Sequence, residues 1–230
     1  WMKQKLCMAV ALALLILVLP ETVLAASVPL KVGDKSWKVK VTQQKLNVVG
    51  INTEITGNFS KDTEKALKDF QQKNKLKVTG LLDDVTYQKV IKAAFEKEGI
   101  RGISGKEIIT TAAKYKGVPY KFGGTTPKAF DCSGYVQYVF GQHKARLPRL
   151  ADAQCLEGIF VLKKDLKEGD LVFFTTYEPG ASHVGIYAGK DQFWNASSHG
   201  VMLSSLKEKY WSEHYYGARR VLADSSNLTK

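Results

Sequence analysis

The sequence predicts an α+β domain over residues 105–225, preceded by a small three-helix domain over residues 30–98. Two patterns support this fold class. Residues 30–98 are rich in lysine and repeat apolar side chains at helical spacing, whereas short runs rich in Val, Ile, Phe and Tyr follow one another from residue 171 onward. With 230 residues, 44% of them hydrophobic and 24% charged, the chain can bury a sizeable core, which excludes a disordered, collagen-like or multi-span membrane protein.

The first 25 residues have the pattern of a secretory signal peptide. A basic start at Lys3 and Lys5 precedes an apolar run over residues 6–19, and the small residues Val23 and Ala25 suit a signal peptidase. The alternative is a retained membrane anchor, but this run has 14 residues and a spanning helix needs roughly 20. We therefore expect cleavage after residue 25, export to a secreted or cell-wall location, and no stable membrane anchor in the mature chain.

The chain is basic, with a formal net charge of +12, and loss of Lys3, Lys5 and Glu21 with the signal segment leaves +11. The charge is spread over both domains, without the clustered arginines and interleaved aromatic residues of a nucleic-acid-binding protein. An exported basic protein is better suited to the anionic polymers of a cell envelope. We expect no nucleic-acid partner, no cofactor and a monomeric chain, and the His and Cys residues lack the spacing of metal ligands.

Three helices are predicted in the first domain. A short one covers residues 42–49, Ser60 can cap a second whose apolar residues between 66 and 70 share one face, and a third begins near Asp83. The domain resembles the small peptidoglycan-binding domain at the ends of cell-wall hydrolases, which implies peptidoglycan as the partner; the alternative is a generic three-helix spacer. The usual Gly-Pro after the aromatic residue is replaced here by Ser60-Lys61. The matching residues are Gln44, Leu46, Gly50, Gly57-Asn58-Phe59, Asp62-Thr63, Ala66, Phe70-Gln71, Leu76-Lys77-Val78-Thr79-Gly80 and Thr86.

The second domain begins after a glycine-rich joint. Residues 98–105 contain three glycines, so a flexible linker is predicted over residues 99–104. Ser104 and Glu107 then form the capping box of a helix. Five short strands are predicted farther along, over residues 171–176, 183–189, 192–197, 201–206 and 218–222.

Cys132 is the candidate nucleophile. It follows a loop rich in glycine and proline and begins an apolar helical run that Asp131 can cap. Backbone N–H groups and the helix dipole at such a position favour the thiolate and can also hold an oxyanion. The alternative is a buried structural cysteine, although such cysteines usually lie inside apolar runs. Cys155 is expected to be a packing residue.

A thiolate nucleophile needs a base, and His183 is the best placed of the four histidines. It opens a predicted strand, so its ring can project from the sheet edge towards the start of the helix. A third polar group should orient the imidazole. Asn195 and His199, on the adjacent strand and turn, are the candidates for that role.

These motifs resemble the NlpC family of bacterial cell-wall cysteine peptidases over roughly residues 105–222. The resemblance implies a papain-like fold and hydrolysis of a peptide bond in the peptidoglycan stem, commonly between D-glutamate and a diamino acid, through an acyl-enzyme on Cys132 with His183 as base. It also implies that three residues lie near the substrate: Tyr120, Asp131 and Ser133. The matching blocks are Gly117-Val118-Pro119-Tyr120-Lys121-Phe122-Gly123-Gly124, Asp131-Cys132-Ser133-Gly134, Leu147-Pro148-Arg149, Gln154, Gly169-Asp170-Leu171-Val172-Phe173-Phe174, Ser182-His183-Val184-Gly185-Ile186-Tyr187 and Arg219-Arg220-Val221-Leu222.

The third catalytic position departs from the family pattern. Family members commonly have His-Ala-Ser on the strand after the base, whereas this chain has Asn195-Ala196-Ser197 followed by His199. An Asn oxygen can accept a hydrogen bond from imidazole, so Asn195 is predicted to orient His183, with His199 as the alternative.

Two other functions stay open. The same residues could serve an acyltransferase or amidase, or the fold could belong to a non-catalytic wall-binding protein, against which the intact Cys132 and His183 argue.

Overall fold

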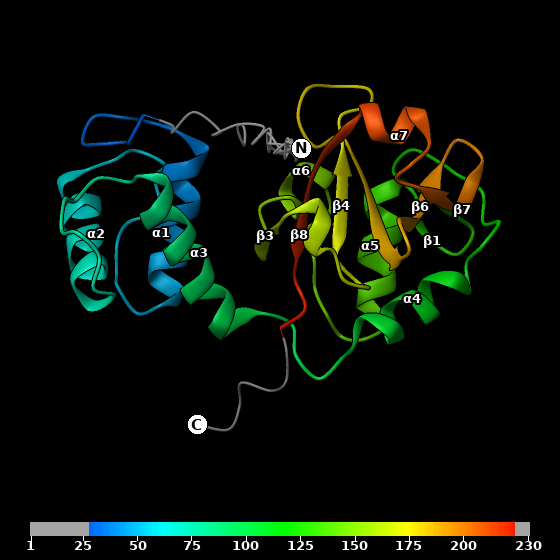
Figure 1. The fold of residues 1–230 in the computed structure, drawn as a ribbon, viewed down its shortest axis with the longest axis horizontal. Coiled ribbons are helices and arrows are strands. Elements are labelled where there is room, and N and C mark those ends of the chain that lie inside the picture. Colours follow the sequence, from blue (N-terminus) through cyan, green and yellow to red (C-terminus); the bar gives the residue numbers. More distant parts are fainter. Residues whose placement is uncertain (1–27, 224–230) are drawn as a thin grey trace, which may run out of the picture.

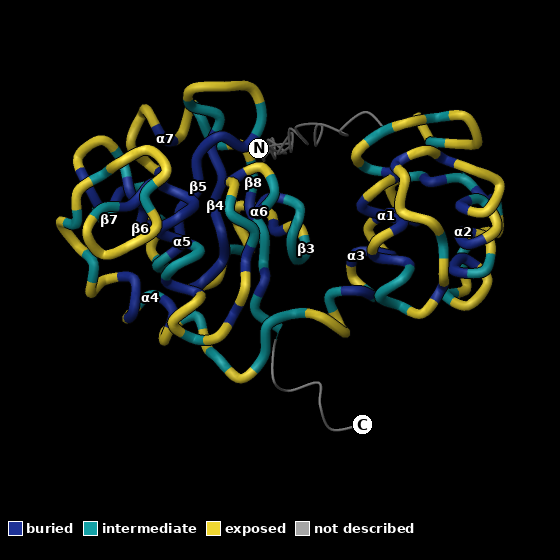
Figure 2. The backbone as a smooth tube through the Cα atoms, turned by 180° about the vertical axis from the view of Figure 1, so that it is seen from behind, coloured by how far each residue is buried: buried dark blue, intermediate teal, exposed yellow. Residues whose placement is uncertain are grey.

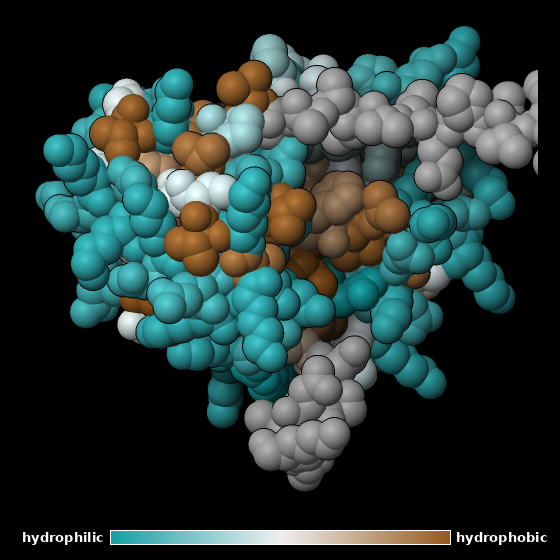
Figure 3. Space-filling view, turned by 60° about the vertical axis from the view of Figure 1, so that its left-hand side comes forward, coloured by the Kyte–Doolittle hydropathy of each residue, from teal (hydrophilic) through white to brown (hydrophobic). Residues whose placement is uncertain are grey.

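The computed structural model describes residues 28–223, which form a helical unit and a larger mixed unit lying side by side (Figure 1). The predicted signal segment lies outside the described residues. Within residues 28–223, no helix has both the length and the apolar character needed to cross a membrane. On the face seen in Figure 3, apolar side chains interrupt a largely hydrophilic surface in several separate places.

The helical unit consists of three helices: α1 (Trp37–Val48), α2 (Lys61–Lys73) and α3 (Asp84–Glu98). The predicted cap at Ser60 is confirmed, because its side chain accepts the backbone N–H of Thr63. The third helix begins next to Asp83, as predicted, and the Asp83 side chain accepts the backbone N–H of Thr86. One apolar core lies between the helices, and its most deeply buried members are Val39, Leu46, Leu67, Phe70, Leu82 and Val90.

Helix α1 begins earlier than the sequence predicted. It starts at Trp37 rather than at residue 42, directly after Ser36, whose hydroxyl accepts a hydrogen bond from the backbone N–H of Val39 at 3.2 Å. The prediction was wrong because residues 37–41 alternate apolar and polar side chains, which is the period of a strand. The helical cap and the packing of Val39 in the core override this local pattern.

A six-stranded antiparallel sheet, in the order β3-β8-β4-β5-β6-β7, forms the centre of the mixed unit. Its strands are β3 (Ile159–Val161), β4 (Leu171–Phe174), β5 (His183–Gly189), β6 (Gln192–Ser197), β7 (Gly200–Ser205) and β8 (Tyr215–Arg220). A separate two-stranded hairpin consists of β1 (Thr125–Thr126) and β2 (Ala129–Phe130). The remaining helices are α4 (Gly105–Ala113), α5 (Cys132–Gly141), α6 (Ala151–Gln154), the 3-10 helix η1 (Lys163–Asp165) and α7 (Lys209–Glu213).

The two faces of the sheet pack against different helices. Leu171 and Phe173 of β4 join one core with α4 and α5, whereas Val172 and Phe174 join a second core with Trp211 of α7. The buried backbone in the middle of the sheet, along β4 and β5, is visible in Figure 2. This arrangement places the start of α5 and the start of β5 in the same part of the molecule.

The predicted strands agree best in the middle of the sheet. The bounds of β5 and β6 are confirmed, as is the capping box of Ser104 and Glu107 at α4. Strand β8 begins three residues before the predicted 218–222 and ends two residues earlier. The sequence did not predict β3, α6 or α7, because elements of three to five residues are too short to show a period.

The joint between the units is bound to the mixed unit, although its glycines predicted a flexible linker. Ile100 pairs with Leu222 in a parallel bridge, with backbone hydrogen bonds of 3.0 Å to Val221 and 2.8 Å from Ala223. Leu156 and Ile159 of the mixed unit also pack against the core of the helical unit. Composition predicts the flexibility of an isolated segment, but here hydrogen bonds to Val221 and Ala223, directly after β8, hold the joint in place.

Candidate active site

Cys132 is the first residue of α5, and its side chain is buried with 4% exposure. Its Sγ lies 4.0 Å from the carbonyl oxygen of Ser182, the residue before His183. Burial raises the pKa of the thiol, whereas the backbone N–H groups of Val184, Ser133 and Cys132 itself oppose that shift. The resting sulfur is therefore a thiol, placed where backbone donors stabilise the thiolate once it forms.

Asp131 caps α5 as predicted and also holds the neighbouring loop. One carboxylate oxygen accepts the backbone N–H of Gly134 at 2.6 Å, and the other accepts that of Gly123 at 2.9 Å. Arg149 forms an ion pair with the same carboxylate and donates to the Ser133 hydroxyl at 3.0 Å. The Asp131 side chain therefore positions Cys132 through the backbone around it.

The structure brings His183 and Asn195 together across β5 and β6. His183 Nε2 and Asn195 Oδ1 are 3.2 Å apart, and Asn195 is fully buried. The Asn195 amide nitrogen donates to the Ser204 hydroxyl at 3.0 Å and to the carbonyl oxygen of Met202 at 3.4 Å. Because that carbonyl can only accept, the amide oxygen faces the histidine, so Nε2 carries the proton and Nδ1 is free to accept one.

Two aromatic side chains cover the His183 ring. Trp211 stacks on it, with ring centroids 5.1 Å apart and planes at 29°, and Phe174 lies at 6.0 Å. Burial lowers the pKa of His183 to about 4, and the hydrogen bond with Asn195 partly opposes this shift. His183 is therefore neutral at pH 7, which is the form that can take a proton from a thiol. No local sequence signal pointed to Trp211, because the stack joins residues far apart in the chain.

His199 lies elsewhere on the hairpin and is exposed. Among the described residues, its ring nitrogen Nδ1 pairs with the hydroxyl of the adjacent Ser198 at 3.4 Å, and no hydrogen bond joins it to His183. It nevertheless lines the same cavity as His183. Asn195, and not His199, thus forms the hydrogen bond with the His183 imidazole.

Two neighbouring cavities lie at the site: one of about 340 Å³ is lined by Cys132, and one of about 610 Å³ is lined by His183. Tyr120 and Tyr177 line both of them. Burial raises the pKa of Tyr120, so its hydroxyl stays protonated and can donate a hydrogen bond. The first cavity also contains Asp131, Ser133 and Arg149; the sequence motif included Arg149, but its role emerges from the ion pair alone.

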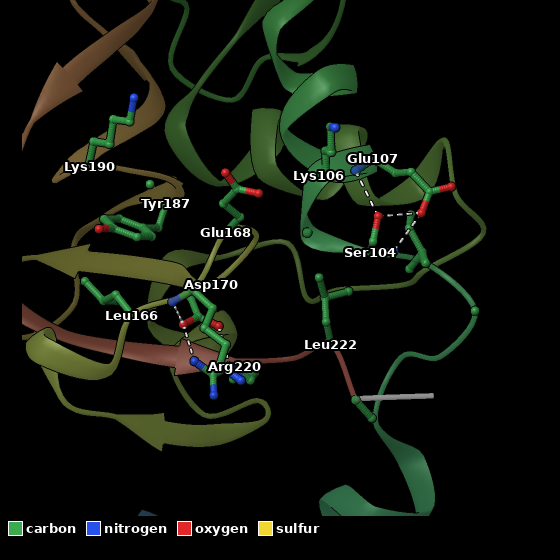
Figure 4. Close-up of a pocket in the computed structure, with 16 residues that line it drawn as sticks. Ser104, Lys106, Glu107, Leu166, Glu168, Asp170, Tyr187, Lys190, Arg220 and Leu222 are labelled. Atoms are coloured by element: carbon green, nitrogen blue, oxygen red, sulfur yellow. Dashed lines mark hydrogen bonds and ion pairs between the residues drawn. The ribbon is translucent and has the colours of Figure 1, made fainter. Parts of the chain in front are cut away.

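A larger cavity, of about 840 Å³, lies beside the start of α4 (Figure 4). Two pairs of its polar side chains bind each other: Ser104 with Glu107 in the capping box, and Arg220 with Asp170 at 2.8 Å. None of its lining residues is a cysteine or a histidine. Its size therefore does not make it the reaction site. Among residues 28–223, no group of three or more His, Cys, Asp or Glu side chains is arranged to hold a metal ion.

Two family models match the chain. The NlpC/P60 family matches residues 117–220, and the putative peptidoglycan binding domain matches residues 37–90. Both matches fall on the units that the structure describes.

Among known proteins, the chain is 50% identical over 117 residues to the gamma-DL-glutamyl hydrolase of Bacillus subtilis. This alignment covers 49% of this chain and 28% of the relative. It is 45% identical over 129 residues to the murein DD-endopeptidase MepS/murein LD-carboxypeptidase of Escherichia coli, covering 55% of this chain and 68% of the relative. A crystal structure of an NlpC/P60 family protein from Bacillus cereus aligns with a TM-score of 0.50 and 31% identity, over 53% of this chain and 41% of that one. The chain thus spans about a quarter of the first relative and about two thirds of the second.

Proposed function

This chain belongs to the NlpC/P60 family, and from that premise we propose that it is a peptidoglycan endopeptidase with Cys132 as nucleophile, His183 as base and Asn195 as the residue that orients the base. The contact that carries the proposal is the 3.2 Å pair between His183 Nε2 and Asn195 Oδ1. It supports an unprotonated Nδ1 on His183. Cys132 lies at a helix N-terminus, with its Sγ 4.0 Å from the carbonyl oxygen of Ser182, the residue before His183, and we propose that these groups act together as nucleophile and base.

The reaction follows from these groups. The thiol proton passes to His183 Nδ1 while Sγ attacks the peptide carbonyl, and the negative charge moves to the carbonyl oxygen. The backbone N–H of Cys132 and the Tyr120 hydroxyl are the proposed donors to that oxygen. The imidazolium returns its proton to the leaving amine as the C–N bond breaks, which leaves a thioester on Cys132. Water then attacks the thioester with His183 as base, giving a carboxylate and the free thiol.

We propose that the bond cut joins D-glutamate to the diamino acid of the stem peptide. The name of the Bacillus relative, a glutamyl hydrolase, supports this choice, whereas the name of the Escherichia relative denotes DD-endopeptidase and LD-carboxypeptidase activities. Asp131, Ser133 and Arg149 line the cavity on the Cys132 side and are the proposed contacts for the acyl part of the substrate. The leaving diamino acid then occupies the cavity on the His183 side.

Export through residues 1–25 and action in the cell wall complete the proposal, with the helical unit binding peptidoglycan. The match of residues 37–90 to a putative peptidoglycan binding domain supports that role.

The test is digestion of purified peptidoglycan by the chain and by its Cys132→Ala variant, with mass spectrometry of the released fragments. The proposal expects fragments that begin with the diamino acid, from the unsubstituted chain alone. Fragments cut solely next to D-alanine would refute the proposed bond, transfer of the acyl group to an added amine in place of hydrolysis would favour an acyltransferase, and equal release by both chains would refute the nucleophile.

A further inference from the structure

A small cavity of about 290 Å³ lies between the helical unit and the mixed unit. Helix α1 forms one wall, and residues Pro148, Ala153 and Leu156 of the mixed unit form the other. This volume is at the lower end of the range for small-molecule sites, and suits one ring rather than an extended chain.

The α1 wall is a single helical face. Trp37, Lys40 and Gln44 are three and four residues apart, so their side chains lie above one another. Trp37 is 57% exposed, an unusual position for an indole unless its face serves a contact. The Lys40 ammonium and the Gln44 amide have no hydrogen-bond or ion-pair partner among residues 28–223, so an aromatic face stands beside a free cation and a free amide.

The two walls are held in place by a buried lysine. Lys45, also on α1, is 8% exposed and forms ion pairs with Glu98 at the end of α3 and with Glu157 of the mixed unit, the latter at 3.5 Å. Together with the backbone pairing of Ile100 and Leu222, these contacts fix α1 against the mixed unit. The cavity is therefore a preformed feature of the two units together.

This interdomain cavity lies next to the Cys132 cavity. The one-turn helix α6 separates them: Ala151 and Asp152 line the Cys132 cavity, whereas Ala153 lines the interdomain cavity. A ligand whose peptide lies at Cys132 therefore needs to pass only one helical turn to reach Trp37. Peptidoglycan has this form, because its stem peptide is attached to a sugar strand.

We infer that Trp37, Lys40 and Gln44 form a subsite for an amino-sugar ring of the peptidoglycan molecule whose stem peptide is bound at Cys132. The inference rests on the proposed function. The apolar C–H face of a pyranose packs on the indole, the Gln44 amide and Lys40 bind sugar hydroxyl or amide carbonyl oxygens, and the N-acetyl methyl group lies against Pro148 and Leu156. The helical unit then contributes part of the substrate cleft, in addition to any separate wall-binding surface.

The experiment compares two ligands, a disaccharide-tetrapeptide released from peptidoglycan by a muramidase and the same tetrapeptide without sugars. Binding is measured by calorimetry on the full chain carrying Cys132→Ala, so that neither ligand is consumed. We expect the disaccharide to bind about three- to tenfold more tightly than the bare peptide, the contribution of one aromatic contact. Adding Trp37→Ala should bring the ratio close to one, and Gln44→Ala should reduce it in part. The matched control is Val85→Ala, another exposed apolar residue of the helical unit that lines none of the cavities described, and it should keep the ratio.

Equal affinities for the two ligands, or an unchanged ratio in a folded Trp37→Ala chain, would overturn the subsite. Turnover of the bare peptide by the chain with intact Cys132 tests the proposed function separately. A sugar preference without any turnover would keep the subsite and refute the endopeptidase.

Discussion

The substitution Asn195→Asp tests whether the group behind His183 controls its protonation. Burial lowers the pKa of His183 to about 4, so the base is neutral over most of the accessible pH range. A carboxylate in place of the amide would lie at hydrogen-bond distance from Nε2, because the present separation is 3.2 Å. A negative charge there favours the imidazolium and must raise the pKa of His183.

The size of the effect follows from that separation. An opposite charge within about 4 Å shifts a pKa by about 1–3 units, so the His183 pKa should rise from about 4 to between about 5 and 7. Since protonated His183 cannot accept the thiol proton, the acid limb of kcat/KM moves to higher pH by the same amount. A variant with a pKa near 6 would keep about one tenth of its neutral-pH activity at pH 5, where the unsubstituted chain is close to its plateau.

The assay is the pH profile of kcat/KM on a soluble stem peptide, with thermal melting to show that each variant is folded. Asn195→Ala is the control without a charge. It should lower kcat by about 10- to 1000-fold without moving the acid limb to higher pH, because His183 loses its orienting partner and gains no charge. A folded Asn195→Asp chain whose acid limb coincides with that of the unsubstituted chain would show that residue 195 does not contact the catalytic imidazole.

Three other predictions concern the remaining side chains. Cys132→Ala should abolish turnover, whereas Cys155→Ala, in the core and away from both active-site cavities, should keep most of it; equal losses in peptide assays would remove the nucleophile assignment. Unfolded His183 takes up a proton near pH 6.5 and the folded site resists protonation until about pH 4, so stability should fall by up to about 3 kcal/mol as pH drops through this window. Urea unfolding at pH 7 and pH 4.5 measures this loss of stability. The difference between the two pH values should be smaller in the His183→Gln chain, because glutamine takes up no proton. Lys45→Met should lower the free energy of unfolding by about 1 kcal/mol, a modest loss because both Glu partners are 37% exposed. It should also increase the radius of gyration, because the two units lose the ion pairs that join them. An unchanged radius would mean that other contacts hold the units together.

Local signals allowed the sequence to predict much of the fold. Ser60 and Ser104 were recognisable as caps because a cap depends on neighbours within three residues. Strands β5 and β6 were predicted at their bounds because both are apolar runs ended by glycine or polar turns. In α1 the local pattern misled, because residues 37–41 alternate as in a strand while the core draws Val39 into a helix.

The rest of the site depends on contacts that no local pattern contains. The pair of His183 and Asn195 could be proposed because both lie on adjacent predicted strands. The stack of Trp211 on His183 joins residues from a five-residue helix and a distant strand, and it covers one face of the imidazole ring. The fixed joint at Ile100 likewise depends on pairing with Leu222, more than a hundred residues away.

The central claim is tested most directly with a synthetic stem peptide containing L-alanine, γ-linked D-glutamate and a diamino acid, whose products are identified by mass spectrometry. The account predicts one cut, with a new free amine on the diamino acid and a free carboxylate on D-glutamate, and no cut by the folded Cys132→Ala variant. An intact peptide after incubation with the unsubstituted chain, or the same products from both chains, would contradict it.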